Sequence, residues 1–161
     1  MTDASGAAVL RRATEADADR LLRLWAMVFD EGGYEGGDEA EPPWRSRARD
    51  WFVRVVDDPS TAWLPLVEAG GEVVATAIGT LELGVPNPYC PRGRTVRLAN
   101  VVTVPGRRGR GHGTLLVRDV VEWARSIDAD RVDLSATPDG RRLYERLGFE
   151  LTTAPRMKLV L

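Results

Sequence analysis

Residues 100–116 decide the fold, and they read N-V-V-T-V-P-G-R-R-G-R-G-H-G-T-L-L. An apolar, β-branched run of the kind found in strands stops at Pro105. Four of the chain's 16 glycines follow before Thr114, where a helix with apolar periodicity begins. Glycines let backbone N–H groups converge, and the N-terminus of a helix adds partial positive charge. The stretch therefore predicts a strand, a phosphate-binding turn and a helix.

The length and charge of the chain narrow the class of protein. Its 161 residues are most simply one domain, and we assign 1–161 to it. A formal net charge of −2 gives no basic surface for nucleic acid. With one cysteine, Cys90, and one histidine, His112, we expect neither an internal disulfide nor a metal site. No leader pattern and no apolar run long enough to cross a bilayer is present, so we expect a cytoplasmic protein without a membrane partner.

The hydrophobic period changes several times along the chain and predicts alternating helices and strands. Helices are expected from a capping box at 14–17, over 44–55, over 111–126 and over 138–147, and strands over 7–12, 61–68, 73–83, 95–104, 131–136, 149–153 and 156–161. Between the first two helices, residues 30–43 hold six carboxylates and no Lys or Arg, and they predict a loop. The order of elements indicates a single α/β domain with a mixed sheet.

Two well-known phosphate-binding motifs do not fit the glycine-rich turn. A nucleoside triphosphate loop requires Gly-Lys-Ser/Thr, whereas Gly113 is followed by Thr114 and Leu115. A dinucleotide fingerprint requires a glycine at position 114 and lies at the beginning of its domain. The pattern that remains is R-G-R-G-H-G at 108–113, of the form Arg-x-x-Gly-x-Gly.

This hexapeptide resembles the acyl-CoA-binding motif of the GNAT acetyltransferase superfamily, Gln/Arg-x-x-Gly-x-Gly/Ala. Residues 102–105 precede it as the family's central strand does, and L-Y-E-R-L-G-F at 143–149 is similar to the family's L-Y-x-x-x-G-F. The resemblance implies the GNAT fold, in which a central, mostly antiparallel sheet splays at the acyl-CoA site between flanking helices. It also implies an acetyl-CoA-dependent N-acetyltransferase with acetyl-CoA as co-substrate and no metal.

The resemblance implies a cofactor site made from the end of the central strand, the turn and two helix starts. Strand backbone would pair with the pantetheine arm, turn N–H groups would hold the pyrophosphate, and Thr137 stands where many relatives have Asn. The residues expected to bind the cofactor are Val102, Thr103, Val104, Arg107, Arg108, Gly109, Arg110, Gly111, His112, Gly113, Thr114, Thr137 and Tyr144.

Three residues are candidates for the chemistry. In the family's pattern, Tyr144 would give a proton to the departing thiolate, and its alternative role is packing beside its helical neighbours. Glu82 is the candidate general base or an exposed strand residue. Asn100 is expected to bind the amine or to position a water molecule.

The acidic segment at 30–41 favours a cationic acceptor, unless it is only a solvated loop. Direct transfer of the acetyl group to a small amine in a ternary complex is the first hypothesis. The alternatives are a protein acetyltransferase that acts on a lysine or an N-terminus, and a non-catalytic acyl-CoA-binding module. The resemblance also allows a homodimer, because dimers are common in the family.

Overall fold

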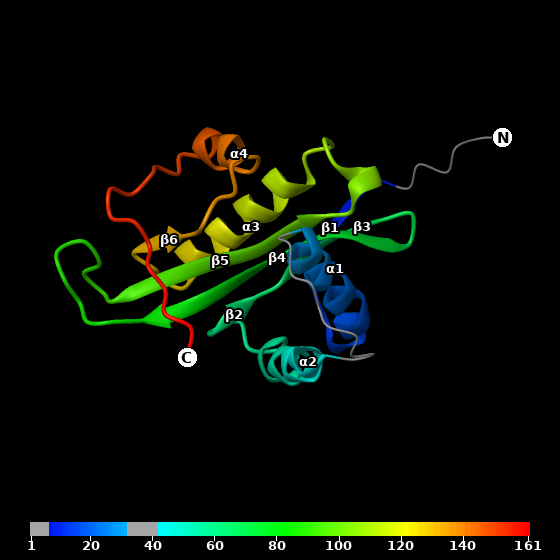
Figure 1. Ribbon diagram of the computed structural model, residues 1–161, viewed down its shortest axis with the longest axis horizontal. Helices are drawn as coiled ribbons and strands as arrows, with labels where there is room; N and C mark the ends of the chain where they lie inside the picture. The colour runs from blue at the N-terminus through cyan, green and yellow to red at the C-terminus, as the bar shows by residue number, and fades with distance from the viewer. Residues whose placement is uncertain (1–6, 32–41) are drawn as a thin grey trace.

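The computed structural model describes residues 7–31 and 42–161, in which a sheet lies between two layers of helices (Figure 1). The strands are β1 (Val9–Arg12), β2 (Ala62–Trp63), β3 (Pro65–Ala69), β4 (Glu72–Leu83), β5 (Arg94–Thr103) and β6 (Arg131–Asp133). The helices are α1 (Ala18–Glu31), α2 (Pro43–Val55), α3 (His112–Ser126) and α4 (Arg141–Arg146), with 3-10 turns η1 (Glu15–Asp17) and η2 (Pro105–Arg107).

The strands follow the order β1-β3-β4-β5-β6, and β2 pairs with β4. Every pair is antiparallel except β5 with β6, which run parallel. The mixed, mostly antiparallel sheet between helices is therefore confirmed. Within the two described ranges, no helix is both long and apolar enough to cross a membrane.

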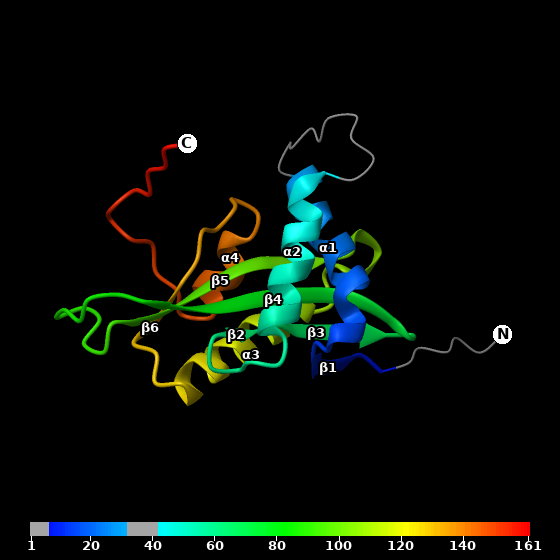
Figure 2. The same ribbon diagram turned by 90° about the horizontal axis from the view of Figure 1, so that it is seen from below.

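Each face of the sheet has its own hydrophobic core. Helices α1 and α2 cover one face (Figure 2). In the core beneath them the rings of Trp25 and Phe52 meet edge to face, with centroids 6.1 Å apart. On the other face, α3 buries Leu116 and Val120. Gly79 of β4 lies under α3, where an added Cβ would come within 2.8 Å of Val120 Cγ1. The absence of a side chain at Gly79 thus lets α3 lie close to the sheet, and this fixes where its N-terminus points.

Most predicted elements form, with shifted ends. The capping box at Thr14 and Asp17 is present, and it opens a 3-10 turn before α1 begins. The strand expected over 61–68 is divided into β2 and β3, and β6 ends at Asp133, earlier than expected. The last helix spans only Arg141–Arg146.

The two closing strands predicted over 149–153 and 156–161 are wrong. Residues 149–161, all within the described part of the chain, form no strand, and Met157 and Leu159 are 90% and 84% exposed. Apolar alternation makes a strand only where a neighbouring edge offers hydrogen bonds over several residues. Because β6 is three residues long, its edge offers the last segment very little.

Candidate active site

A bulge interrupts β5 near its C-terminal end. Asn100 and Val101 together stand opposite Ala77 of β4, so β5 has one residue more than its partner at this point. Asn100 has φ +48°, in the left-handed region that Asn tolerates better than most residues with a side chain. The bulge gives Asn100 a structural role, and it bends the strand before the glycine-rich turn.

Beyond a short paired segment, β5 and β6 separate. They pair only where Thr95 to Arg97 face Arg131 to Asp133, and β5 continues to Thr103 after β6 has ended. The C-terminal half of β5 therefore has one edge without a strand partner in the described chain. A cavity of about 330 Å³ begins where the two strands separate, and its lining includes Arg97, Asp133 and Tyr144.

Backbone hydrogen bonds decide which residues of β5 face this open edge. The Val104 N–H donates to the Val74 carbonyl at 2.9 Å, and the Val104 carbonyl accepts from the Arg107 N–H at 2.9 Å. The Val104 N–H is therefore directed at β4 and its carbonyl already accepts one hydrogen bond, and a contact between Val104 and the cofactor stays a prediction. Val102 lies two positions earlier and presents its backbone to the same side, toward β4. Thr103, between them, is the residue of this group whose backbone faces the open edge.

The glycine-rich turn joins this edge to the N-terminus of α3. Gly109 and Gly111 have φ +74° and +81°, and Gly111 is the N-cap of the helix. The first backbone hydrogen bond of α3 runs from the Leu115 N–H to the Gly111 carbonyl, at 3.1 Å. The N–H groups of residues 112–114 thus have no partner within the helix, and with the helix dipole they form a site suited to an anion.

The third glycine of the motif has a different role. A Cβ on Gly113 would lie 3.1 Å from Leu143 Cδ1, so this glycine allows α4 to approach the start of α3. His112, the first residue of α3, is buried, with 7% exposure. Gly113 therefore couples the anion site to the helix that carries Tyr144.

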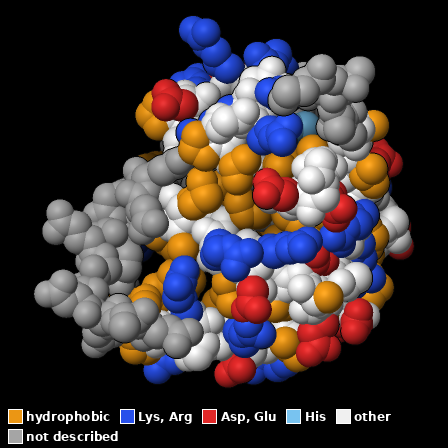
Figure 3. Space-filling model, turned by 90° about the vertical axis from the view of Figure 1, so that its right-hand side faces the viewer, with side chains coloured by type: hydrophobic (Ala, Val, Ile, Leu, Met, Phe, Trp, Pro, Cys, Tyr) orange, Lys and Arg blue, Asp and Glu red, His pale blue; other side chains and the backbone are white. Residues whose placement is uncertain are grey.

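The arginines of the turn do not all point into the anion site. Arg108 donates through Nε to the Thr103 carbonyl at 2.9 Å, along the open edge of β5. Arg107 extends toward the β3–β4 turn, where its Nη2 lies 3.9 Å from the position of a Cβ on Gly70. Arg110 is exposed. Figure 3 views this end of the molecule, and Lys and Arg side chains cross its middle.

Tyr144 both packs in the core and borders the cavity. Its ring meets that of Phe149 edge to face, with centroids 5.8 Å apart, and both residues line the cavity at the separation of the strands. Burial raises the pKa of the Tyr144 hydroxyl, so the group is protonated at neutral pH. Thr137 accepts a hydrogen bond through Oγ1 from the N–H of Gly140, the N-cap of α4, at 3.2 Å.

Glu82 lies far from the bulge. It stands opposite Thr95 at the other end of β5, five residues before Asn100, which is about 16 Å along a strand. Its Oε1 accepts from Arg97 Nε at 3.4 Å. The structure thus brings Glu82 to Arg97, and its role as a base stays a prediction.

Two residues of this region were absent from the sequence analysis. Arg97 and Asp133 stand opposite each other at the last paired position of β5 and β6. Nothing in the order of residues signals this pairing, which only the register creates. The described residues contain no group of three or more His, Cys, Asp or Glu side chains that could hold a metal ion.

Comparisons with known proteins assign the family. The model of the acetyltransferase (GNAT) family matches residues 18–149. The chain therefore belongs to the GNAT acetyltransferase family, whose members are N-acetyltransferases. No curated protein sequence matches the chain significantly.

Solved structures agree with this fold over nearly the whole chain. A predicted acetyltransferase from Clostridium acetobutylicum, solved with acetyl-CoA, superposes with a TM-score of 0.84 at 21% identity and covers 96% of each chain. A GCN5-related N-acetyltransferase from Ralstonia eutropha JMP134 gives 0.82 at 23% identity, over 95% of this chain and 99% of that one. Glucosamine-6-phosphate N-acetyltransferase from Arabidopsis thaliana gives a TM-score of 0.75 at 15% identity, over 95% of this chain and 98% of that one. At these identities the similarity establishes the fold.

Proposed function

We propose that the chain moves an acetyl group from acetyl-CoA to the primary amine of a small molecule. The observation that carries this proposal is the continuous path from the open edge of β5, at Thr103, to the unpaired N–H groups at the start of α3. An extended arm with amide groups and a pyrophosphate end matches this path. The acetyl-CoA in the crystal of the Clostridium acetobutylicum relative supports the same donor.

The chemistry requires three events at the thioester. The amine nitrogen attacks the carbonyl carbon, the carbon–sulfur bond breaks, and the leaving sulfur takes a proton from the Tyr144 hydroxyl. Strand N–H groups beside the bulge would stabilise the negative charge on the carbonyl oxygen. Because a thiol leaves easily and the Tyr144 hydroxyl is protonated, one hydrogen bond to sulfur is sufficient assistance. The attacking nitrogen carries one proton more than the amide product and loses it to solvent as the carbon–sulfur bond breaks, while Tyr144 regains its proton from solvent.

The amine must lose a proton before it attacks, because its reference pKa is about 10.4. Asn100, at the bulge, is our candidate for binding the amine or positioning a water molecule that takes this proton. Glu82 is the candidate carboxylate, and it would act through water because it stands about 16 Å away along the strand. Transfer is direct, in a ternary complex, because the lone Cys90 is buried with its sulfur 3.2 Å from Asp130 Oδ2.

The charge of the acceptor is argued from the sequence. Residues 30–41 hold six carboxylates, which favours an acceptor with a positively charged amine. Residues 32–41 lie outside the described part of the chain. A lysine or N-terminus of a protein satisfies the same charge argument, so the test includes peptides.

The experiment is release of CoA thiol from acetyl-CoA in the presence of amine and peptide panels. We expect thiol release that depends on a small amine and yields its acetylated product. Faster transfer to peptides than to any small amine would favour the protein acetyltransferase. Tight binding of acetyl-CoA without transfer to any acceptor would identify a non-catalytic acyl-CoA-binding module.

A further inference from the structure

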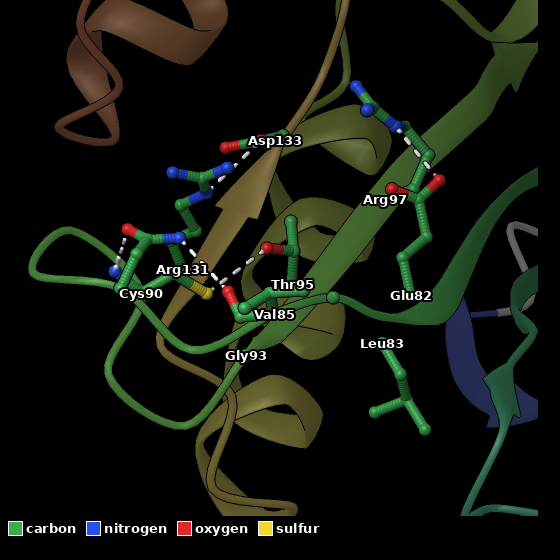
Figure 4. A pocket seen from close by; sticks show the side chains of 11 residues that line it. Glu82, Leu83, Val85, Cys90, Gly93, Thr95, Arg97, Arg131 and Asp133 are labelled. Atoms are coloured by element: carbon green, nitrogen blue, oxygen red, sulfur yellow. Dashed lines mark hydrogen bonds and ion pairs between the residues drawn. The ribbon is translucent and has the colours of Figure 1, made fainter.

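Four charged side chains from three neighbouring strands lie together on one face of the sheet. Glu82 comes from β4, Arg97 from β5, and Arg131 and Asp133 from β6. The register puts Glu82 and Arg131 on either side of Thr95. An acidic and a basic side chain therefore lie on the two strands that flank β5 at this position. These four residues line a cavity of about 260 Å³ (Figure 4).

Both arginines are held in a way that leaves their outer nitrogens available. Arg97 contacts Glu82 through Nε at 3.4 Å, and Arg131 contacts Asp133 through Nε at 3.3 Å. Among the described residues, the Nη atoms of both arginines have no hydrogen-bond partner. The two side chains rise from neighbouring strands on the same side of the sheet (Figure 4). Each carboxylate therefore positions an arginine whose free fork faces the cavity.

The cavity adjoins the larger one that Tyr144 lines. Arg97 and Asp133 also line the larger cavity, which contains Tyr144. The two cavities thus share a wall where β5 and β6 separate, and under the proposed function the thioester lies beside Tyr144 in the larger one. A molecule that approaches the thioester from this side has one end beside Tyr144 and the other end over Arg97 and Arg131.

We propose that the acceptor carries a carboxylate as well as its amine, and that the carboxylate binds to the Nη atoms of Arg97 and Arg131. This inference rests on the proposed function and names its substrate class, a small amino acid or a similar amino carboxylate. A guanidinium fork matches a planar carboxylate with two parallel hydrogen bonds. The carboxylates of Glu82 and Asp133 offset the charges of the two arginines, so the cavity has no excess positive charge for a doubly charged phosphate, and a singly charged carboxylate is the anion that we propose.

The test uses pairs of amines that differ only in the carboxylate. L-lysine is compared with 1,5-diaminopentane, γ-aminobutyrate with propylamine, and glycine with methylamine, by thiol release at saturating acetyl-CoA. Charge-assisted hydrogen bonds to both forks should favour the carboxylated member of the best pair by roughly 10- to 100-fold in kcat/KM. Aminoethyl phosphate is included as the phosphate analogue and should be the poorer substrate.

Variants assign the preference to the arginines. R97Q and R131Q should each reduce the preference for the carboxylated amine by about tenfold or more, with the KM for acetyl-CoA unchanged. R97K keeps the charge but loses the fork, and it should retain part of the preference. R125Q is the matched control, because Arg125 is exposed on α3 and pairs with Glu122. Thermal unfolding of each variant shows whether it is folded.

The outcomes separate this inference from the proposed function. Transfer to amines at equal rates with and without a carboxylate would contradict the inference alone. A carboxylate preference that survives intact in the folded R97Q and R131Q variants would contradict it as well, and so would a preference for aminoethyl phosphate. Transfer to no amine at all would overturn the proposed function together with the inference.

Discussion

The two ends of β5 meet their neighbours in different ways. At the C-terminal end, consecutive residues form the bulge, the glycine-rich turn and the start of α3, and backbone groups make the anion site. At the N-terminal end, side chains from β4, β5 and β6 meet through strand register. A backbone site keeps its chemistry when surrounding side chains change, whereas a side-chain site changes with each substitution. Under the proposed function, we therefore expect the donor half of the site to be shared across the family and the acceptor half to differ.

The largest effect is expected where the two halves meet, at Tyr144. Y144F should lower kcat by about 100-fold and leave the affinity for acetyl-CoA nearly unchanged, because it removes only the proton donor. Rapid-mixing thiol release and calorimetry measure the two quantities. Because burial raises the Tyr144 pKa, the wild-type rate should not fall with deprotonation of this hydroxyl until above about pH 10.

The matched control for this prediction is Y89F. Tyr89 is 86% exposed on the loop between β4 and β5, so its hydroxyl should not affect turnover. A kcat of Y144F equal to that of the wild type would remove Tyr144 from the mechanism.

The next prediction tests whether the backbone of the glycine-rich turn contributes more to acetyl-CoA affinity than its arginine side chains do. In G111V, a β-branched side chain replaces glycine at φ +81°, and the strain should weaken acetyl-CoA binding by roughly 5- to 30-fold. R110A removes an exposed charge from the same turn and should weaken binding by only about twofold. Calorimetry with both variants compares them directly. A larger loss in R110A than in G111V would mean that side-chain charge dominates the site.

The bulge itself gives a smaller effect on stability. N100V should lower the free energy of unfolding by about 1–2 kcal/mol, because valine is strained at φ +48°. N100G keeps the backbone conformation and should be close to wild type in a denaturant titration. If N100G is stable but slow, the Asn100 side chain takes part in the reaction. An N100V variant as stable as N100G would show that the left-handed conformation at this position costs nothing.

The smallest effect on stability is expected for an ion pair beside β1, at the edge of the sheet opposite β6. A change there should leave both halves of the site unchanged. Arg11 donates to Asp17 at 2.8 Å, and together with the Thr14 N–H it lowers the pKa of the buried Asp17 to about 2. A lowered pKa stabilises the fold above the unfolded value, near 3.9, and this contribution is lost as the pH falls toward 2.

Partial exposure of Arg11 screens the pair, so D17N should cost about 1 kcal/mol at pH 7. The loss should shrink as the pH falls from 4 to 2, which denaturant titrations at several pH values measure. An equal loss at pH 2 and at pH 7 would show that the charge of Asp17 is not the cause. Acetyl-CoA affinity serves as the control and should not change.

The fold was predictable where the determinants are local. A cap is specified by Thr14 with Asp17, and a helix by the apolar period of α3. The turn between β3 and β4 is specified by Gly70 and Gly71. The prediction of two strands within 149–161 was wrong because the alternation of apolar and polar residues does not show whether a partner strand edge exists.

The site divides in the same way. The glycine-rich turn and Tyr144 belong to contiguous patterns and could be located from sequence. The direction of the Val104 N–H could not be predicted from the sequence, because the side to which a strand backbone points depends on its partner, here Val74. Arg97 and Asp133 were missed because they meet only through the pairing of β5 with β6.

Initial-rate kinetics with acetyl-CoA and the best amine varied together, combined with the intact mass of the protein after acetyl-CoA alone, test most directly whether the two halves act in one complex. The account predicts intersecting double-reciprocal lines and no acetylated protein, since the amine attacks the bound thioester itself. Parallel lines together with an acetyl-enzyme would contradict it, because the acetyl group would then have passed through a side chain of the protein.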